Sequence, residues 1–427
     1  MFRFDQGLPN FWPIIAIFGL HVSNASSFNF SRGAMRISSG TSSLRDLRSP
    51  LKSMNIFSHS TKSEVYVKKQ ETGLAHFLLQ RAIDSPLWKY FLAPQAKAKM
   101  LSTAEANGVP WSEALQWIQK QDGPWKEKNG NIQQTTSFPT YYTQKFHAYE
   151  DGNLSWEAAF EQEIVGRAVG ARNFPAYKDE GDLAFRTAFQ AAFDSMNVSV
   201  PDDGVIVDMA CGTGTSTRNL AKRWKNARQI IGLDMSPYFI GVGQRLLEIC
   251  PKSYKEGGPW VCTVEKDDRI ELQVGDATDT RLPDNFSDAV NVQFLFHEMP
   301  IEKSIAVCRE AFRILKPGGQ MWIGEMDFQA PAYAAQRANV LLFSLIRATE
   351  PYLDDYADGI PEIISELTML FEQVEIKGAT GRHFAIVAKK STSGAKTESG
   401  SLIDKRFNED GSYSVQDTHL NFWEVKK

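Results

Sequence analysis

The stretch Val205-Ile206-Val207-Asp208-Met209-Ala210-Cys211-Gly212-Thr213-Gly214 decides the fold expected for this chain of 427 residues. Its apolar first half is short and runs into a glycine turn, so it predicts a β-strand buried on both faces, as strands of parallel sheets are. Gly212 and Gly214 permit a tight turn and let a ligand approach main-chain N–H groups. We expect a helix to follow at once, capped by Thr215, Ser216 and Thr217.

Two carboxylates flank this turn and indicate the charge of its ligand. Asp208 precedes the glycines, and Asp234 follows the next apolar run. A dinucleotide site has the pattern G-x-G-x-x-G or A, whereas this chain has Thr217 in the last position, and Asp208 would repel a pyrophosphate. S-adenosylmethionine (SAM) instead carries positive sulfonium and ammonium groups, and its ribose hydroxyls suit a strand-end acid such as Asp234. The pattern therefore favours SAM over NAD(P).

Strands and helices continue to alternate after Asp234. Residues 271–277 predict a third strand that ends in Asp276, and residues 288–294 predict a fourth. Residues 305–315 carry apolar side chains at helical spacing, and the run KPGG at 316–319 ends that helix before a fifth strand at 320–325. This order predicts a parallel sheet covered by helices on both faces.

Four runs in this region resemble those of the class I SAM-dependent methyltransferases, and within them the type-11, UbiE-like group. They are DMACGTG (208–214), GLDMS (232–236), GDA (275–277) and REAFRILKPGG (309–319). The resemblance covers residues 201–390. It implies an α/β fold with a Rossmann-like, doubly wound, seven-stranded sheet that is mostly parallel and has an antiparallel edge strand.

The resemblance also implies which residues contact the cofactor. Asp208 and residues 212–215 are expected near the methionine part of SAM, Asp234 on the ribose, and Asp276 with Ala277 beside the adenine. No metal ligands are expected. The full set of expected cofactor-binding residues is Asp208, Ala210, Gly212, Thr213, Gly214, Thr215, Asp234, Met235, Asp276, Ala277 and Gln293.

Composition sets outer bounds on the fold and its partners. A hydrophobic content of 42% is enough to bury one large core or two smaller ones. The net charge of −4 gives no electrostatic basis for gripping nucleic acid, so none is expected as a partner. The cysteines show no C-x-x-C spacing, so we expect reduced thiols rather than disulfides or a zinc site. They are Cys211, Cys250, Cys262 and Cys308.

Residues 1–60 have the composition of a targeting presequence. The apolar run 11–20 is about half a membrane span long, which suits a signal-peptide core better than a transmembrane helix. Residues 28–62 are rich in serine and arginine and hold only one acid, Asp46. The combination resembles the bipartite plastid presequence of algae with complex plastids. We therefore expect a plastid (chloroplast) protein without a transmembrane span in its mature chain; mitochondrial or cytoplasmic localisation, or a disordered tail with a chance apolar run, are the alternatives.

Residues 61–200 predict an N-terminal helical extension. Trp111, Leu115 and Ile118 form one apolar stripe, and residues 74–82 contain another. The aromatic segment 138–156 resembles a segment ahead of the core in methyltransferase-like proteins of cyanobacteria and plastid-bearing organisms. It is interpreted either as a lid that excludes water from the cofactor or as an aromatic contact between the helices and the sheet, and both could hold.

The C-terminal part should complete the sheet. Residues 371–376 and 383–388 have strand character and are separated by a glycine-containing turn, so they predict a hairpin with one antiparallel edge strand. Residues 391–427 begin with a run rich in serine, glycine and charge, and we expect a flexible C-terminal tail there.

Candidates for handling a proton of the methyl acceptor follow the fourth and fifth strands, because open α/β sheets bind ligands at the carboxyl ends of their strands. His297 and Glu298 follow the fourth strand, and Asp327 follows the fifth. Each has a structural alternative, since Glu298 could serve a helix N-terminus, His297 could bond to the backbone, and Asp327 could cap the next segment. Further candidates that could equally be structural are His383, Tyr352 and Tyr356.

The expected acceptor is a small molecule. Methyltransferases of exocyclic nucleobase amines resemble one another in an Asn/Asp-Pro-Pro-aromatic run after the fourth strand, and residues 294–300 (FLFHEMP) lack it. That region also lacks the cysteine nucleophile that cytosine C5 chemistry needs. Family analogy favours a quinone or a phenol. An NAD(P)-dependent reductase and a non-catalytic SAM-binding assembly factor are the alternative functions.

Overall fold

The computed structural model describes residues 93–126, 138–147, 149–249, 266–338, 343, 346–347, 349–396 and 399–416. The expected presequence at 1–60, the apolar stripe at 74–82, and Cys250 and Cys262 lie outside these residues. Cys211 and Cys308 lie within them and are buried free thiols, as expected.

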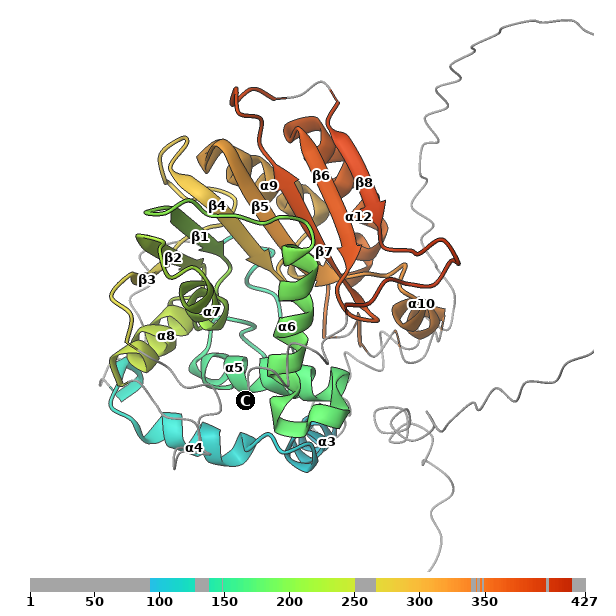
Figure 1. The fold of residues 1–427 in the computed structure, drawn as a ribbon. Helices are drawn as coiled ribbons and strands as arrows, with labels where there is room; N and C mark the ends of the chain where they lie inside the picture. Colours follow the sequence, from blue (N-terminus) through green and yellow to red (C-terminus); the bar gives the residue numbers. More distant parts are fainter. Residues whose placement is uncertain are drawn as a thin grey trace, which may run out of the picture. The chain divides into compact units, whose positions relative to one another are not determined.

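A parallel array of strands forms the centre of the fold (Figure 1). The strands lie side by side in the order β3 (Ile270–Val274), β2 (Gln229–Asp234), β1 (Val205–Met209), β4 (Ser287–Gln293) and β5 (Leu315–Met326). Every residue of β1 is buried, as its apolar sequence predicts. The strand order reverses between β1 and β4, and ligands of open α/β sheets bind at the carboxyl ends beside such a reversal.

The other half of the sheet differs from the expectation in two respects. The hairpin of β6 (Gln373–Gly378) and β7 (His383–Lys389) is confirmed, but β7 lies between β5 and β6, so the antiparallel strand is internal. An eighth strand, β8 (Ser401–Lys405), pairs parallel with β6 and forms the edge. The sheet therefore has eight strands rather than seven, and the prediction of a flexible tail is wrong for the part that contains β8. Most side chains of β8 are exposed, so its sequence has no apolar alternation to reveal a strand.

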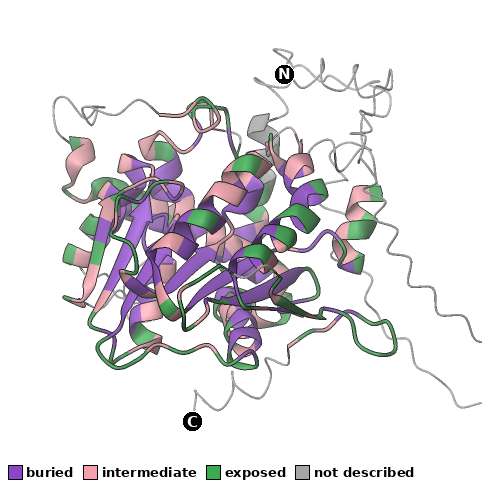
Figure 2. Cartoon of the chain, turned by 90° about the horizontal axis from the view of Figure 1, so that it is seen from above, coloured by how far each residue is buried: buried purple, intermediate pink, exposed green. Residues whose placement is uncertain are grey.

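Helices cover both faces of the sheet. α9 (Ile301–Ile314) and α12 (Leu353–Leu370) pack against one face. α6 (Gly181–Asp194) and α7 (Thr215–Arg223) pack against the other, and α8 (Pro237–Ile249) covers β3 beside them. Figure 2 shows the buried strands between helices whose outer sides are exposed. The fold is thus the doubly wound, Rossmann-like α/β arrangement predicted from the sequence.

The helical extension consists of α3 (Ala93–Ala106), α4 (Trp111–Lys120) and α5 (Trp156–Asn173), which pack together with α8 around a core of their own. Trp111 and Ile118 are fully buried, so this part of the predicted stripe is confirmed. The extension and the sheet belong to one compact unit that begins at Ala82. Shorter elements are η2 (Pro124–Lys126), η3 (Pro175–Glu180), η5 (Phe296–Glu298) and α10 (Pro331–Ala338). Of the helices in the described ranges, none is long and apolar enough to cross a bilayer.

Two glycines allow α5 to lie very close to the start of α6. A Cβ atom on Gly170 would lie 2.4 Å from the Cα atom of Asp182, and one on Gly181 would lie 2.4 Å from the Cα atom of Ala171. Because larger residues would separate the two backbones, these glycines fix the position of α5 against the sheet domain.

Candidate cofactor and acceptor site

The turn between β1 and α7 is left-handed at several positions. Gly212 has φ = 58°, Gly214 has φ = 86°, and Ala210 also has a positive φ of 57°. Gly214 is the N-cap residue of α7, and no side chain caps this helix. The expectation that the hydroxyls after Gly214 act as caps is therefore wrong, because two of them bind a carboxylate instead.

That carboxylate is Asp208, which points into the protein. Its Oδ2 accepts hydrogen bonds from the hydroxyls of Ser216 and Thr217, both at 2.6 Å, and its Oδ1 accepts one from Asn291 Nδ2 at 2.7 Å. Gln293 Nε2 in turn donates to Asn291 Oδ1 at 2.9 Å. Burial raises the pKa of Asp208, and this effect is larger than the lowering caused by these hydrogen bonds. Asp208 thus fixes the start of α7 against β1 and β4, and a direct contact with the cofactor stays a prediction for Asp208 and Gln293.

Helix α5 reaches the glycine turn from the helical extension. Gln162 Oε1 accepts hydrogen bonds from the Thr213 hydroxyl at 2.7 Å and from the Thr213 N–H at 3.3 Å. Glu163 forms a buried ion pair with Arg218 at 2.5 Å, and Arg218 also donates to the Thr213 carbonyl at 3.0 Å. Side chains of α5 and α7 therefore hold the turn on two sides.

Asp234 ends β2 beside this turn. Its Oδ2 accepts a hydrogen bond from the Gly212 N–H at 2.9 Å, and its Oδ1 accepts one from the Ser236 N–H at 2.8 Å. Burial raises the pKa of Asp234 to about 6, although these N–H groups and the hydroxyl of Tyr142 lower it. Asp234 as a whole residue is 7% exposed, so it is almost completely buried at this edge of the sheet.

The residues expected around the nucleoside lie at the same edge. The Gly275 N–H donates to the Asp234 carbonyl at 2.9 Å, which brings Asp276 close behind Asp234. One oxygen of Asp276 accepts from the N–H and the hydroxyl of Thr278, both at 2.7 Å. Ala277 is buried, while Met235 is half-buried.

These residues fit SAM. Within the described ranges, Asp234 and Asp276 accept hydrogen bonds only from N–H and hydroxyl groups, and no lysine or arginine neutralises them. Such an acidic edge favours hydroxyl groups and positive charge in its ligand and disfavours pyrophosphate.

The aromatic segment 138–156 makes contacts of both expected kinds. Beside the carboxyl end of β2, the Tyr142 hydroxyl lies close enough to Asp234 to lower its pKa, and the Ser236 hydroxyl donates to the Asn153 carbonyl at 2.6 Å. On the side of the helices, the Tyr149 hydroxyl donates to Glu161 at 2.5 Å, and Trp156 packs against rings of η2, α5 and α8. The segment therefore covers the carboxyl end of β2 while it is anchored on α5.

His297 and Glu298 lie in η5, just beyond β4. His297 bonds to a carboxylate rather than to the backbone, because its Nδ1 lies 3.0 Å from both oxygens of Glu325. Burial lowers the pKa of His297, but the negative charge of Glu325 outweighs it and the pKa rises to about 10. Burial raises the pKa of Glu298 to about 7. Glu298 accepts from Asn153 Nδ2 at 3.2 Å, and no side chain caps the N-terminus of α9.

Asp327 follows β5 and has structural partners. Its side chain is fully buried and accepts hydrogen bonds from the guanidinium of Arg406 at 3.3 Å and from the hydroxyl of Tyr413 at 2.8 Å. It also accepts from the Gln329 N–H at 2.9 Å, as its structural alternative predicts. The carboxylate therefore anchors the chain beyond β8.

His383 and the two tyrosines of the 349–356 region also have structural partners. The Nδ1 of His383 pairs with the Thr380 hydroxyl at 2.7 Å and its Nε2 with the Tyr333 hydroxyl at 3.2 Å, and burial lowers its pKa to about 3. Tyr356 is a core residue that donates to the Met326 carbonyl at 2.5 Å. Tyr352 donates to the Tyr141 carbonyl at 3.3 Å.

Several residues of the site were missed from the sequence because their partners lie far along the chain. Gln162 on α5 meets the glycine turn, and Glu325 on β5 meets His297. Asn291 links Asp208 to Gln293, and its place at the end of an apolar strand could have revealed it. Glu350 lies 2.8 Å from His147.

Comparisons with known proteins agree with this geometry. Residues 206–319 match a family described as a methyltransferase domain. The demethylmenaquinone methyltransferase of Bacillus licheniformis is 31% identical over 191 residues, which are 42% of this chain and 73% of that protein. The enzyme of the same name from Bacillus subtilis is 27% identical over 198 residues, which are 44% of this chain and 77% of that protein.

One solved structure that resembles the chain is a SAM-dependent methyltransferase from Aquifex aeolicus. It is 15% identical, covers 48% of this chain and 90% of its own, and has a TM-score of 0.33.

Proposed function

Because this chain belongs to the UbiE-like group of class I SAM-dependent methyltransferases, we propose that it transfers the methyl group of SAM to a small aromatic acceptor of the quinone or phenol class. The observation that carries the choice of acceptor is the name shared by its relatives, which are demethylmenaquinone methyltransferases. Family membership decides against an NAD(P)-dependent reductase.

A cluster of aromatic rings lies beyond the carboxyl end of β5, and most of them belong to the core. Phe328 lies 5.3 Å from Tyr333, 5.9 Å from Phe343 and 6.1 Å from Tyr356 between ring centroids, and Tyr356 lies 6.3 Å from His297. Among these four rings Tyr333 alone is half-buried, so it is the one placed to contact a flat apolar ligand.

The protein's part in the reaction is mainly to align the reactants. SAM supplies an activated methyl group on a positive sulfur. In the proposed complex, Asp234 orients the ribose, the turn held by Gln162 and Arg218 positions the methionine part, and segment 138–156 excludes water. A phenol oxygen or ring carbon has to lose a proton, and His297 and Glu298 stay the candidates for that step because they follow β4. Glu298, whose pKa is about 7, can accept a proton near neutral pH, whereas His297, whose pKa is about 10, does so only at high pH.

Transfer of labelled methyl groups tests the proposal. The full chain is incubated with methyl-labelled SAM and a reduced demethylated naphthoquinone, with a simple phenol as the second acceptor. We expect label in the ring compound with wild-type protein and none with Asp234→Ala. Binding of S-adenosylhomocysteine (SAH) without any labelled product from these acceptors or from a plastid extract would contradict the proposal and support the assembly-factor alternative.

His297 has its own test within this assay. His297→Ala should bind SAH as tightly as the wild type but turn over more slowly if the imidazole handles the acceptor's proton. Wild-type turnover would remove His297 from the mechanism.

We also propose that residues 1–60 direct the protein to a plastid, on the basis of their composition. A fusion of residues 1–62 to a fluorescent protein should accumulate in the plastid of an alga with complex plastids. Fluorescence in mitochondria or in the cytosol would contradict it.

A further inference from the structure

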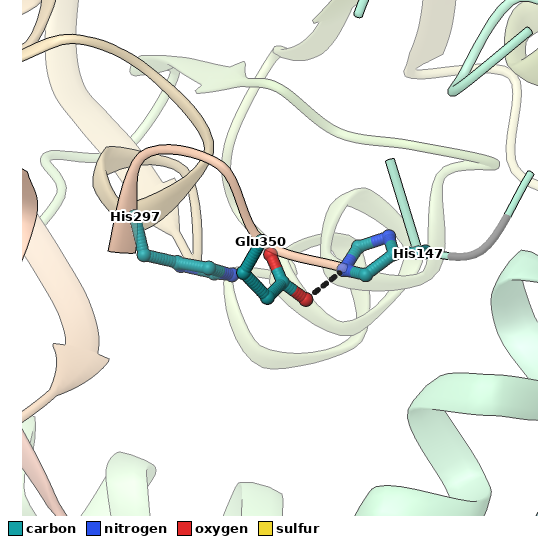
Figure 3. A group of neighbouring side chains, drawn as sticks. All are labelled: His147, His297 and Glu350. Atoms are coloured by element: carbon teal, nitrogen blue, oxygen red, sulfur yellow. Dashed lines mark ion pairs between the residues drawn. The ribbon is translucent and has the colours of Figure 1, made fainter. Parts of the chain in front are cut away.

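Three side chains from distant parts of the chain meet just beyond the carboxyl end of β4 (Figure 3). His147 comes from segment 138–156, His297 from η5 and Glu350 from the segment ahead of α12. Each side chain offers one ligand atom, a ring nitrogen or a carboxylate oxygen, and these three atoms lie within 4.8 Å of one another. We propose that these side chains bind a divalent transition-metal ion of the Zn²⁺ class, although the sequence alone gave no reason to expect one.

His297 is oriented in the way that a metal-binding histidine is. Its Nδ1 faces both oxygens of Glu325 at 3.0 Å, and the Glu325 side chain is 1% exposed. Nε2 is therefore the nitrogen left for a metal ion, and a metal there would leave the acceptor's proton to Glu298. A carboxylate behind the ring fixes its direction and increases its basicity as a ligand, and such carboxylates accompany most metal-binding histidines.

Glu350 has an oxygen without a partner. Its Oε1 lies 2.8 Å from His147 Nε2, whereas its Oε2 is buried and has no hydrogen-bond partner in the described part of the chain. An unpaired buried carboxylate oxygen is costly, and a bound cation would satisfy it.

The local charge also favours a cation. Glu298, Glu325 and Glu350 surround the two imidazoles, and within the described ranges their ion pairs are with these histidines and with no lysine or arginine. Glu298 Oε1 lies 4.0 Å from His147 Nε2 and adds a further negative charge. Two histidines with one or two carboxylates are a common ligand set for Zn²⁺ and Fe²⁺.

The ligand atoms would have to close in slightly around an ion. Tetrahedral Zn²⁺ holds its nitrogen and oxygen ligands at about 2.0–2.2 Å, which places neighbouring ligand atoms roughly 3.4 Å apart. In the structure the three ligand atoms lie within 4.8 Å of one another. The His147 side chain is 38% exposed and so has room to rotate toward the other two. A bound ion would then tie segment 138–156 to η5 and to the segment ahead of α12.

Metal titration of the full chain tests the proposal without any methyl acceptor, so its failure is distinct from failure of the proposed function. After dialysis against a chelator, Zn²⁺ affinity is measured by competition with a chromophoric chelator and the bound metal is counted by mass spectrometry. We expect one ion per chain, and a loss of affinity of at least about 100-fold in both His147→Ala and Glu350→Gln. Lys145→Ala, an exposed neighbour in the same segment, is the matched control and should bind as the wild type does.

Circular dichroism and SAH affinity show whether each variant is folded. Folded His147→Ala and Glu350→Gln proteins that bind Zn²⁺ as tightly as the wild type would overturn the proposal. So would a wild-type chain that holds no stoichiometric Zn²⁺, Fe²⁺ or Mn²⁺.

Discussion

Asp234 should make the affinity for the cofactor depend on pH, because burial raises the pKa of its carboxyl group to about 6. Only the ionised carboxylate is a strong acceptor for the ribose hydroxyls, so SAH affinity should be constant at high pH. The affinity should fall as the pH drops below about 6. At low pH the fall should approach tenfold per pH unit, because binding then requires the release of one proton from Asp234. Calorimetry between about pH 5 and pH 8 measures this dependence.

The control for this prediction is Asp234→Asn, which should bind weakly and show no such dependence. A wild-type affinity that stays flat down to about pH 5 would show that Asp234 does not meet the ribose.

At the residue scale, the sequence could place Gly212, Gly214 and Asp234 because they lie in neighbouring strand-and-turn units close along the chain. The structure brings Gly212 and Asp234 into contact and gives both glycines a positive φ. His147 and Glu350 belong to segments far apart in the chain, so only the tertiary fold could reveal their contact. The pairing of Asp327 with Arg406 could not be predicted, because Arg406 lies in a region whose composition predicts a tail.

At the scale of elements, α5 and α7 are joined by the buried pair of Glu163 and Arg218. Glu163→Gln leaves the guanidinium buried without its counter-charge, which should lower the free energy of unfolding by about 3 kcal/mol. Glu157→Gln is the matched control: Glu157 also lies on α5, but its ion pair with Lys97 is exposed. Urea unfolding measures both. Equal stabilities of the two variants would show that this pair does not hold α5 to the glycine turn.

The edge strand β8 should matter for stability although its side chains are exposed. Arg406 follows β8 and pairs with Asp327, which is fully buried. Arg406→Met should therefore destabilise the protein by about 3 kcal/mol, because it leaves a buried carboxylate without its cation. Lys405→Met, at an exposed neighbouring position, should have little effect. An unchanged urea midpoint in Arg406→Met would mean that residues beyond β8 are not anchored there.

For the whole molecule, the sequence predicted the doubly wound sheet but not where the folding unit ends. The boundaries 201 and 390 follow the run of strand and helix signals, whereas the structure adds α5 on one side and β8 on the other. We expect a fragment of residues 201–390 to fail to bind SAH, because it lacks Gln162, Glu163 and the anchor of Asp327. The full chain and the fragment can be compared by circular dichroism and calorimetry; a folded fragment with full-length affinity would refute this.

The most direct test of the whole account is calorimetric titration of the purified full chain with SAM and with SAH, beside NAD⁺ and NADP⁺. The account predicts saturable binding of SAM and SAH at one site per chain, its loss in Asp234→Ala, and no heat from either dinucleotide. Binding of a dinucleotide with no response to SAM or SAH would contradict it.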